Sequence, residues 1–149
     1  IMIVDLLRND LNMVSSNVRV EDFRYVEKIN AGDKELLQVS SKIAGDLEEN
    51  WQENLGDILL TLLPAGSISG TPKKSSVEII KDVEGYQRGY FCGVFGYFNG
   101  DYLDSGVIIR YIENESNELY YKSGGGITAD SIAFKEYQEM KDKIYVPVF

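Results

Sequence analysis

Histidine is absent from the 149 residues of this chain, and cysteine occurs once, at Cys92. The lack of histidine removes the commonest general base, the Ser-His-Asp arrangement and histidine-based zinc sites. Acid–base chemistry would therefore fall to carboxylates, lysine or tyrosine. A single cysteine cannot form an internal disulfide, and the apolar setting of Cys92 between Tyr90 and Phe95 predicts a buried, unreactive thiol.

Basic residues are also scarce, because 15 Lys and Arg face 24 Asp and Glu, which gives a net charge of −9. This balance argues against a nucleic-acid partner, whose recognition starts from a basic patch. An anionic substrate would have to be held by local cations, backbone amides or a metal. The sequence contains no run of about 18 apolar residues and no signal-peptide pattern. We therefore predict no membrane span and expect a cytoplasmic protein.

Periodicity divides the chain into helices and strands within one domain or a substantial part of one. Helices are predicted over residues 1–11, 54–63, 72–83 and about 130–145. Strands are predicted over 17–21, 37–43, 89–98, 102–111 and 118–122. The turn Asn99-Gly100-Asp101 predicts a β-hairpin between the third and fourth of these strands. The fold class is therefore α+β, with a largely antiparallel sheet packed with helices.

The segment Pro64–Lys74 joins a glycine-containing loop to the start of a helix. Gly66 and Gly70 allow close backbone approach or a positive φ, Thr71 is the predicted N-cap, and Pro72 suits the first helical position. Such a loop directs amide donors and the positive end of a helix dipole at one spot, which predicts an anion site. The alternative is an ordinary loop, and the glycine spacing differs from that of a Walker loop.

The last predicted helix carries Glu136, Glu139 and Lys143 on one stripe, at positions i, i+3 and i+7. Two carboxylates one turn apart repel each other unless a cation lies between them. Mg²⁺ binds carboxylates together with substrate oxygens, so Glu136 and Glu139 are candidate metal ligands. The alternative is a solvated charged face on which Glu139 and Lys143 form an ion pair.

Six segments, in the same order, resemble the chorismate-utilising enzymes, a family that includes anthranilate synthase component I, aminodeoxychorismate synthase component I, isochorismate synthase and salicylate synthase. They are MIVDLLRND (2–10), GSISGTPK (66–73), RGYFCGVFGYF (88–98), VIIR (107–110), GGGITADS (124–131) and EYQEMKDK (136–143). Each segment alone is a weak signal, but together they cover nearly the whole chain. The resemblance implies the α+β fold of that family.

The resemblance also implies roles for individual side chains. Glu139 would ligate Mg²⁺ directly, and Glu136 would support the ion through water. Tyr97 and Arg110 would hold the enolpyruvyl carboxylate of chorismate, and Lys143 would contact a substrate carboxylate. Taken without the resemblance, Arg110 would be interpreted as a strand-edge ion pair and Tyr97 as a core residue.

The glycine segments are the other implied substrate contacts. The backbone amides of Gly124, Gly125 and Gly126 would face the substrate. Gly66 and Ser67 match the loop of the family that carries a hydroxyl residue.

Gln38 departs from the family pattern, because the matching strand often carries histidine at this position. Glutamine can form hydrogen bonds but cannot shuttle a proton near neutral pH. A family mechanism that needs an imidazole there is therefore in doubt. We take Gln38 and Ser67 as the candidate catalytic positions.

Family members are longer than this chain, and other Mg²⁺ ligands and a reactive lysine precede the position of Ile1. We therefore expect residues 1–149 to be the C-terminal portion of a chorismate-binding catalytic domain. By resemblance, the parent enzyme would convert chorismate to 4-amino-4-deoxychorismate in para-aminobenzoate (folate) biosynthesis. It would use Mg²⁺ and ammonia from a glutamine amidotransferase partner. The residues Gly66-Ser67, the three consecutive glycines and the run Glu136-Tyr-Gln-Glu139 favour this reaction.

Two alternatives stay open. Ser69 favours anthranilate synthase component I, an enzyme of tryptophan biosynthesis. A hypothesis of another class is a non-catalytic half-domain that self-associates through exposed apolar surface. Without the upstream lysine, we expect the isolated chain to lack synthase activity.

Overall fold

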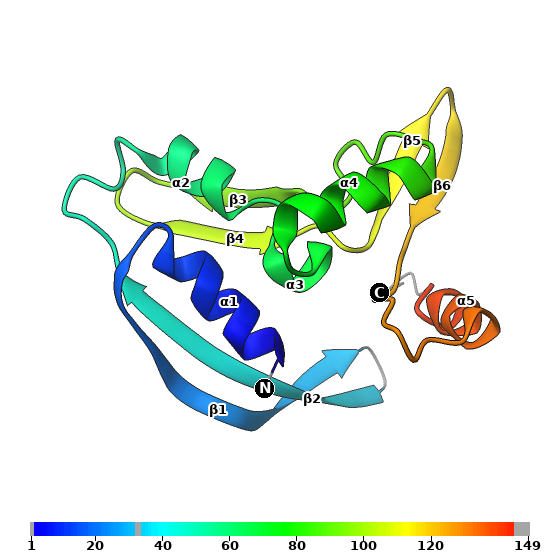
Figure 1. The fold of residues 1–149 in the computed structure, drawn as a ribbon, viewed down its shortest axis with the longest axis horizontal. Helices are drawn as coiled ribbons and strands as arrows, with labels where there is room; N and C mark the ends of the chain where they lie inside the picture. Colours follow the sequence, from blue (N-terminus) through cyan, green and yellow to red (C-terminus); the bar gives the residue numbers. More distant parts are fainter. Residues whose placement is uncertain (1, 32–33, 145–149) are drawn as a thin grey trace.

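The computed structural model describes residues 2–31 and 34–144, which contain both helices and antiparallel strands (Figure 1). The helices are α1 (Met2–Asn12), α2 (Leu55–Leu62), α3 (Gly66–Ser69), α4 (Lys73–Glu84) and α5 (Ala133–Asp142). The strands are β1 (Ser16–Ala31), β2 (Lys34–Asp46), β3 (Val94–Phe98), β4 (Leu103–Val107), β5 (Tyr111–Glu115) and β6 (Glu118–Lys122). The predicted α+β class with antiparallel pairing is confirmed. Within the described residues, however, the strands pair as three separate hairpins, β1–β2, β3–β4 and β5–β6.

Helix α1 lies along the β1–β2 hairpin and also contacts α2 and α3, so it joins the hairpin to the helical layer (Figure 1). This helix agrees with the predicted one, although Ile1 lies outside the described residues. The amphipathic pattern of the segment explains the arrangement, because a helix with one apolar stripe is stable only when that stripe packs on a neighbour.

The β1–β2 hairpin is longer than predicted, because register shifts interrupt the alternation that the sequence analysis relied on. Such bulges lie near Asn17 and Arg24, whose φ values are 50° and 55°. An extra residue in one strand moves the following side chains to the other face, so the period of two is lost while the pairing continues.

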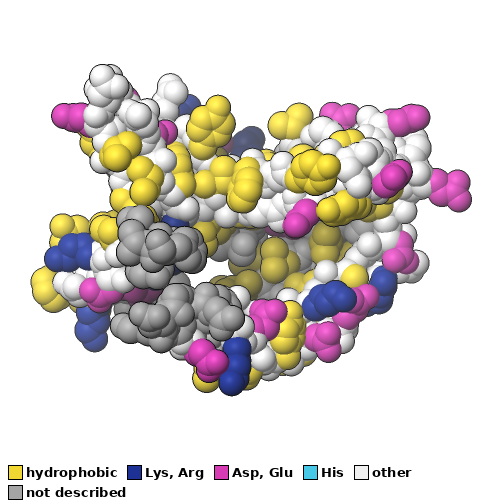
Figure 2. Space-filling model, turned by 180° about the vertical axis from the view of Figure 1, so that it is seen from behind, with side chains coloured by type: hydrophobic (Ala, Val, Ile, Leu, Met, Phe, Trp, Pro, Cys, Tyr) yellow, Lys and Arg dark blue, Asp and Glu magenta, His cyan; other side chains and the backbone are white. Residues whose placement is uncertain are grey.

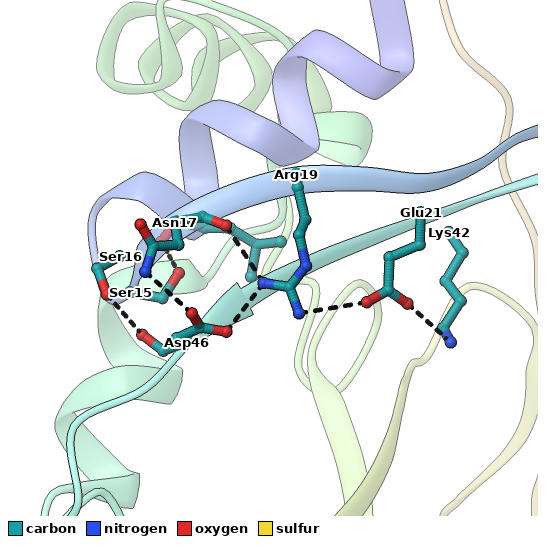
Figure 3. A network of polar contacts seen from close by, with 8 residues as sticks. Ser15, Ser16, Asn17, Arg19, Glu21, Lys42 and Asp46 are labelled. Atoms are coloured by element: carbon teal, nitrogen blue, oxygen red, sulfur yellow. Dashed lines mark hydrogen bonds and ion pairs between the residues drawn. The ribbon is translucent and has the colours of Figure 1, made fainter.

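A polar network links the beginning of β1 to the end of β2 (Figure 3). Asp46 accepts hydrogen bonds from Arg19 Nη1 at 2.9 Å and Asn17 Nδ2 at 3.1 Å. Glu21 then lies between Arg19, at 3.3 Å, and Lys42, at 2.8 Å. The Arg19 and Asn17 donors lower the pKa of Asp46, and Lys42 with Arg19 lowers that of Glu21. Because all these groups are exposed, the network sets register more than it adds stability.

The predicted hairpin at Asn99-Gly100-Asp101 is confirmed, and Asn99 Oδ1 accepts hydrogen bonds from the N–H groups of Asp101 and Tyr102, both at 2.9 Å. Such side-chain acceptance two and three residues along the chain is typical of an Asx turn. The prediction of one strand over 102–111 is wrong, because β4 ends at Val107 and Tyr111 begins β5. The turn expected over 113–117 is shorter, at Ser116 and Asn117, which both have positive φ.

Two predicted helix starts need correction. Pro72, not Thr71, stands at the N-cap of α4, and no side chain caps that helix. At α5 the N-cap is Ile132, while Ser131 Oγ accepts a hydrogen bond from the N–H of Thr128 at 3.0 Å.

Segment 66–69, expected as a loop, forms the single-turn helix α3. The last helix ends at Asp142, and Tyr145 lies outside the described residues.

Much apolar surface is exposed, as Figure 2 shows for one face of the molecule. The accessible surface is 11602 Å², whereas a compact monomer of this mass would expose about 7,700 Å². Of the hydrophobic residues in the described part, only Cys92 is buried, and Leu60, Val83 and Phe134 are each more than 70% exposed. Every helix within residues 2–31 and 34–144 is too short or too polar to cross a membrane.

Candidate functional site

The loop predicted to hold an anion already contains one, the carboxylate of Asp10 from α1. The N–H of Gly66 donates to Asp10 Oδ2 at 2.6 Å, and Lys73 Nζ lies 2.8 Å from Oδ1. Lys73 also donates to the carbonyl of Leu62 at 3.1 Å. A Cβ on Gly66 would lie 2.9 Å from Asp10 Oδ2, so glycine permits this approach. The anion that this loop holds therefore belongs to the protein itself.

This contact corrects the prediction for Gly66, because its buried N–H is used by Asp10 and is not free for a substrate. The neighbouring Ser67 is exposed instead. Asp10 was not predicted as the partner of this loop. The sequence held a signal for this contact, since Asp10 is the last residue of the first matching segment and Lys73 is the last residue of the second.

Beside this loop lies a cleft of about 400 Å³, bordered by α3, the end of α4, the segments before β3 and β5, the segment after β6, and α5. It brings together six of the residues predicted to bind substrate: Ser67, Arg110, Gly124, Gly125, Gly126 and Lys143. These residues come from four segments that are distant in the sequence. Ser123 Oγ donates to the carbonyl of Met140 at 3.4 Å and so ties the glycine segment to α5.

Three cations line the cleft, and two of them are neutralised by neighbouring carboxylates. Arg88 donates to both carboxylate oxygens of Glu84, at 2.5 and 2.7 Å. Lys143 Nζ lies 2.5 Å from Glu139 Oε1. Arg110 forms no ion pair with any acidic residue that the structure describes, so it is the cation of this cleft left available for an anionic ligand.

Glu136 and Glu139 lie on the helix that borders the cleft. A Cβ on Gly125 would lie 3.9 Å from Glu136 Oε2, which places this carboxylate beside the glycine segment. Glu139 is 58% exposed and forms the ion pair with Lys143 that was the alternative interpretation. Among the described residues, no three acidic, histidine or cysteine side chains gather as a metal site. Two carboxylates still suit Mg²⁺, which takes its other oxygens from substrate and water.

Tyr97 and Gln38 do not line this cleft. Tyr97 lies on β3 and is 65% exposed. Gln38 lies on β2, and its Nε2 donates to Ser40 Oγ at 3.1 Å, while that hydroxyl in turn donates to Glu27. The roles assigned to Tyr97 and Gln38 by resemblance stay predictions.

Cys92 forms part of the cleft wall and is 8% exposed, as its apolar setting predicted. Burial raises the pKa of its thiol, and the nearby Arg88 guanidinium only partly opposes this effect. A thiol with a raised pKa is a poor nucleophile near neutral pH. The predicted inert character of Cys92 therefore agrees with its surroundings.

The sequence pattern of the chorismate binding enzyme family matches residues 1–148. This chain belongs to the chorismate binding enzyme family. It is 51% identical over 146 residues to an uncharacterized PabA-like protein of Haemophilus influenzae, covering 98% of this chain and 44% of that protein. It is 38% identical to aminodeoxychorismate synthase component 1 of Klebsiella aerogenes, covering 97% of this chain and 31% of that protein.

Anthranilate synthase component 1 of Acetivibrio thermocellus is 37% identical over 96% of this chain and 28% of its own length. The chain thus spans less than half the length of these curated relatives. In this family member, the cleft lined by a lysine, three consecutive glycines and an arginine with no ion pair among the described residues is the candidate functional site.

Among the described residues, substitution of Asp10 by alanine would remove the only hydrogen-bond acceptor of the Gly66 N–H and the counter-charge of Lys73, which would keep only the Leu62 carbonyl. We expect the free energy of unfolding, measured by urea denaturation, to fall on the order of 3 kcal/mol. Asp10→Asn should cost less, because the amide oxygen still accepts from Gly66. The control is Asp5→Ala on the same helix, where an exposed carboxylate pairs with Arg8 at 3.3 Å. Equal stability of the Asp10 and Asp5 variants would contradict this assignment.

Proposed function

We propose that this chain supplies the chorismate-binding wall of an enzyme that converts chorismate to 4-amino-4-deoxychorismate. The observation that carries the proposal is the gathering of Ser67, Arg110, Lys143 and the glycine segment Gly124–Gly126 around one cleft in a member of this family. A space of about 400 Å³ accommodates a small dicarboxylate. The runner-up is the anthranilate synthase reaction on the same substrate.

Each side chain has a task that suits its chemistry. The planar guanidinium of Arg110 would bind one chorismate carboxylate through two parallel hydrogen bonds. The Ser67 hydroxyl and the amides of Gly124–Gly126 would donate to further oxygens, since glycine lets backbone N–H groups come close to a ligand. The long flexible stem of Lys143 would reach a second carboxylate.

The choice between the two reactions rests on sequence features, because identities of 38% and 37% do not separate the synthases. The residues Gly66-Ser67 and the three glycines favour aminodeoxychorismate synthase. Ser69, the feature that favours anthranilate synthase, is buried, and its Oγ donates at 3.2 Å to the carbonyl of Ala65, the N-cap residue of α3. A residue occupied by its own helix is weak evidence about the substrate, so the aminodeoxychorismate proposal stands.

In the proposed reaction, a lysine of the parent enzyme adds to the ring as the 4-hydroxyl leaves. Ammonia from a glutamine amidotransferase subunit then displaces this lysine and gives the 4-amino product. This chain would bind and orient chorismate, with Glu139 and Glu136 holding Mg²⁺. The ion would neutralise the ring carboxylate and help to position it. We expect the isolated chain to bind chorismate without converting it.

Chorismate binding to the isolated chain tests the role of Arg110. In a calorimetric titration, Arg110→Met should weaken binding on the order of tenfold or more, because the bidentate charge-assisted contact is lost. Lys74→Met is the matched control, since this exposed cation lies on α4 away from the cleft. Equal affinities of the two variants would contradict the proposed site. Formation of aminodeoxychorismate by the isolated chain with ammonia would contradict the need for the upstream lysine.

Binding of Mg²⁺ is a second test. The isolated chain should bind the ion weakly, because two carboxylates provide few of its six oxygens. We expect Glu139→Gln to remove this binding and Glu136→Gln to weaken it, as measured by calorimetry or by shifts of α5 amide resonances. Asp142→Asn is the control, because this carboxylate on the same helix accepts a hydrogen bond from Gln138 at 2.7 Å. Tight binding that survives Glu139→Gln would show that the ligands lie elsewhere.

The exposed apolar surface favours a second candidate, self-association of the isolated chain. The surface in excess of a compact monomer is larger than one partner's share of a standard interface, which is about 800 Å². We therefore expect multi-angle light scattering to give a mass above one chain, rising with concentration. A monomer at every concentration, with one cooperative unfolding transition, would contradict this candidate.

A further inference from the structure

The guanidinium of Arg88 is held from three directions at the wall of the cleft. Glu84, the last residue of α4, accepts from Nε and Nη2, and Nη1 donates to Cys92 Sγ at 3.3 Å. The remaining contact is the ring of Phe91, whose centroid lies 5.5 Å from Arg88 Cζ. With its charge matched by Glu84, Arg88 is a poor receptor for a substrate carboxylate, although it lines the cleft.

The ring of Phe91 in turn limits the position of the glycine segment. A Cβ on Gly124 would lie 3.0 Å from Phe91 Cζ and 3.5 Å from Cε1. The distance of 3.0 Å is tighter than nine in ten contacts of real Cβ atoms, so a side chain at position 124 would require the Phe91 ring to shift by a few tenths of an ångström. The ring therefore sets how far the amides of Gly124–Gly126 project into the cleft.

The Phe91 side chain also borders a second hollow. On its other side lies a hollow of about 530 Å³, mainly apolar and lined by Leu63, Val77 and Ile80. Phe91 and Arg88 border both this hollow and the cleft, so they form part of the wall between them. An aromatic ring gains free energy by entering an apolar space, and the Arg88 contact opposes that movement.

We propose that Arg88 is a positioning residue, which holds the Phe91 ring against Gly124 and so places the amides of Gly124–Gly126 for the ligand. Glu84 fixes the guanidinium, and Arg88 keeps the ring out of the apolar hollow. The geometry of this chain of contacts stands alone, whereas its effect on chorismate binding rests on the proposed function.

The test uses the full chain with ¹⁵N-labelled glycine. Arg88→Met keeps an unbranched apolar side chain but removes the positive charge and the N–H donors of the guanidinium. We expect it to shift the amide resonances of Gly124–Gly126 and to weaken chorismate binding on the order of tenfold, while far-ultraviolet circular dichroism is unchanged. The control Lys74→Met should leave both measurements as in the parent chain. Unmoved glycine resonances in Arg88→Met would overturn the proposal, whether or not chorismate binds.

A compensation experiment addresses the ring directly and does not need a folded Arg88 variant. Gly124→Ala should displace the segment and weaken binding, because its Cβ meets the Phe91 ring. Phe91→Leu in that background should return the Gly125 and Gly126 resonances toward their original positions. A double variant no closer to the parent chain than Gly124→Ala would overturn the role of the ring. Shifted resonances in a chain that binds no chorismate would support the positioning role and contradict the proposed function.

Discussion

The arrangement of the helices depends on the contacts of the Asp10 carboxylate. It meets the N–H of Gly66 and the ammonium of Lys73, so it ties α1 to α3 and to the start of α4. This tie matters because the described part of the chain has so little buried apolar surface. In a well-packed domain, side-chain burial would fix the relation of these helices. Here the Asp10–Lys73 ion pair and the Asp10–Gly66 hydrogen bond help to fix the relation of these helices. Such contacts are specific in direction as well as in distance.

The consequences of this tie extend to the cleft. Lys73 begins α4 and Glu84 ends it, so a helix anchored on Asp10 at one end carries the partner of Arg88 at the other. The Ser67 side of the cleft and the glycine side are thus connected through one rigid element. Glu84 on α4 pairs with Arg88 and Glu139 on α5 pairs with Lys143, so that Arg110 is the cleft cation with no ion pair among the described residues.

Local sequence signals predicted the local features well. The amphipathic segment of α1, the Asn99-Gly100-Asp101 turn and the helix after Pro72 each depend on neighbours within a few residues. The contact between Asp10 and Gly66 joins residues 56 positions apart, and no periodicity reports such a partner. The Asn99-Gly100-Asp101 hairpin was predicted, but the division of the described strands into three separate hairpins was not. Strand pairing beyond a tight turn is decided by distant packing. Within the site, resemblance pointed to six of the residues that line the cleft, but it did not indicate that Asp10 accepts from the Gly66 amide or that Tyr97 lies outside the cleft.

The ion pair between Lys143 and Glu139 has a thermodynamic consequence. Lys143 is suited to bind an anion and Glu139 a cation. When neither ligand is bound, the two side chains pair with each other. A cation that takes Glu139 leaves Lys143 without its counter-charge and so strengthens its attraction for an anion. Since coupling free energies are reciprocal, an anion at Lys143 must favour a cation at Glu139 by the same amount. Two oppositely charged ligands would therefore bind to this end of α5 as linked equilibria, each raising the affinity for the other.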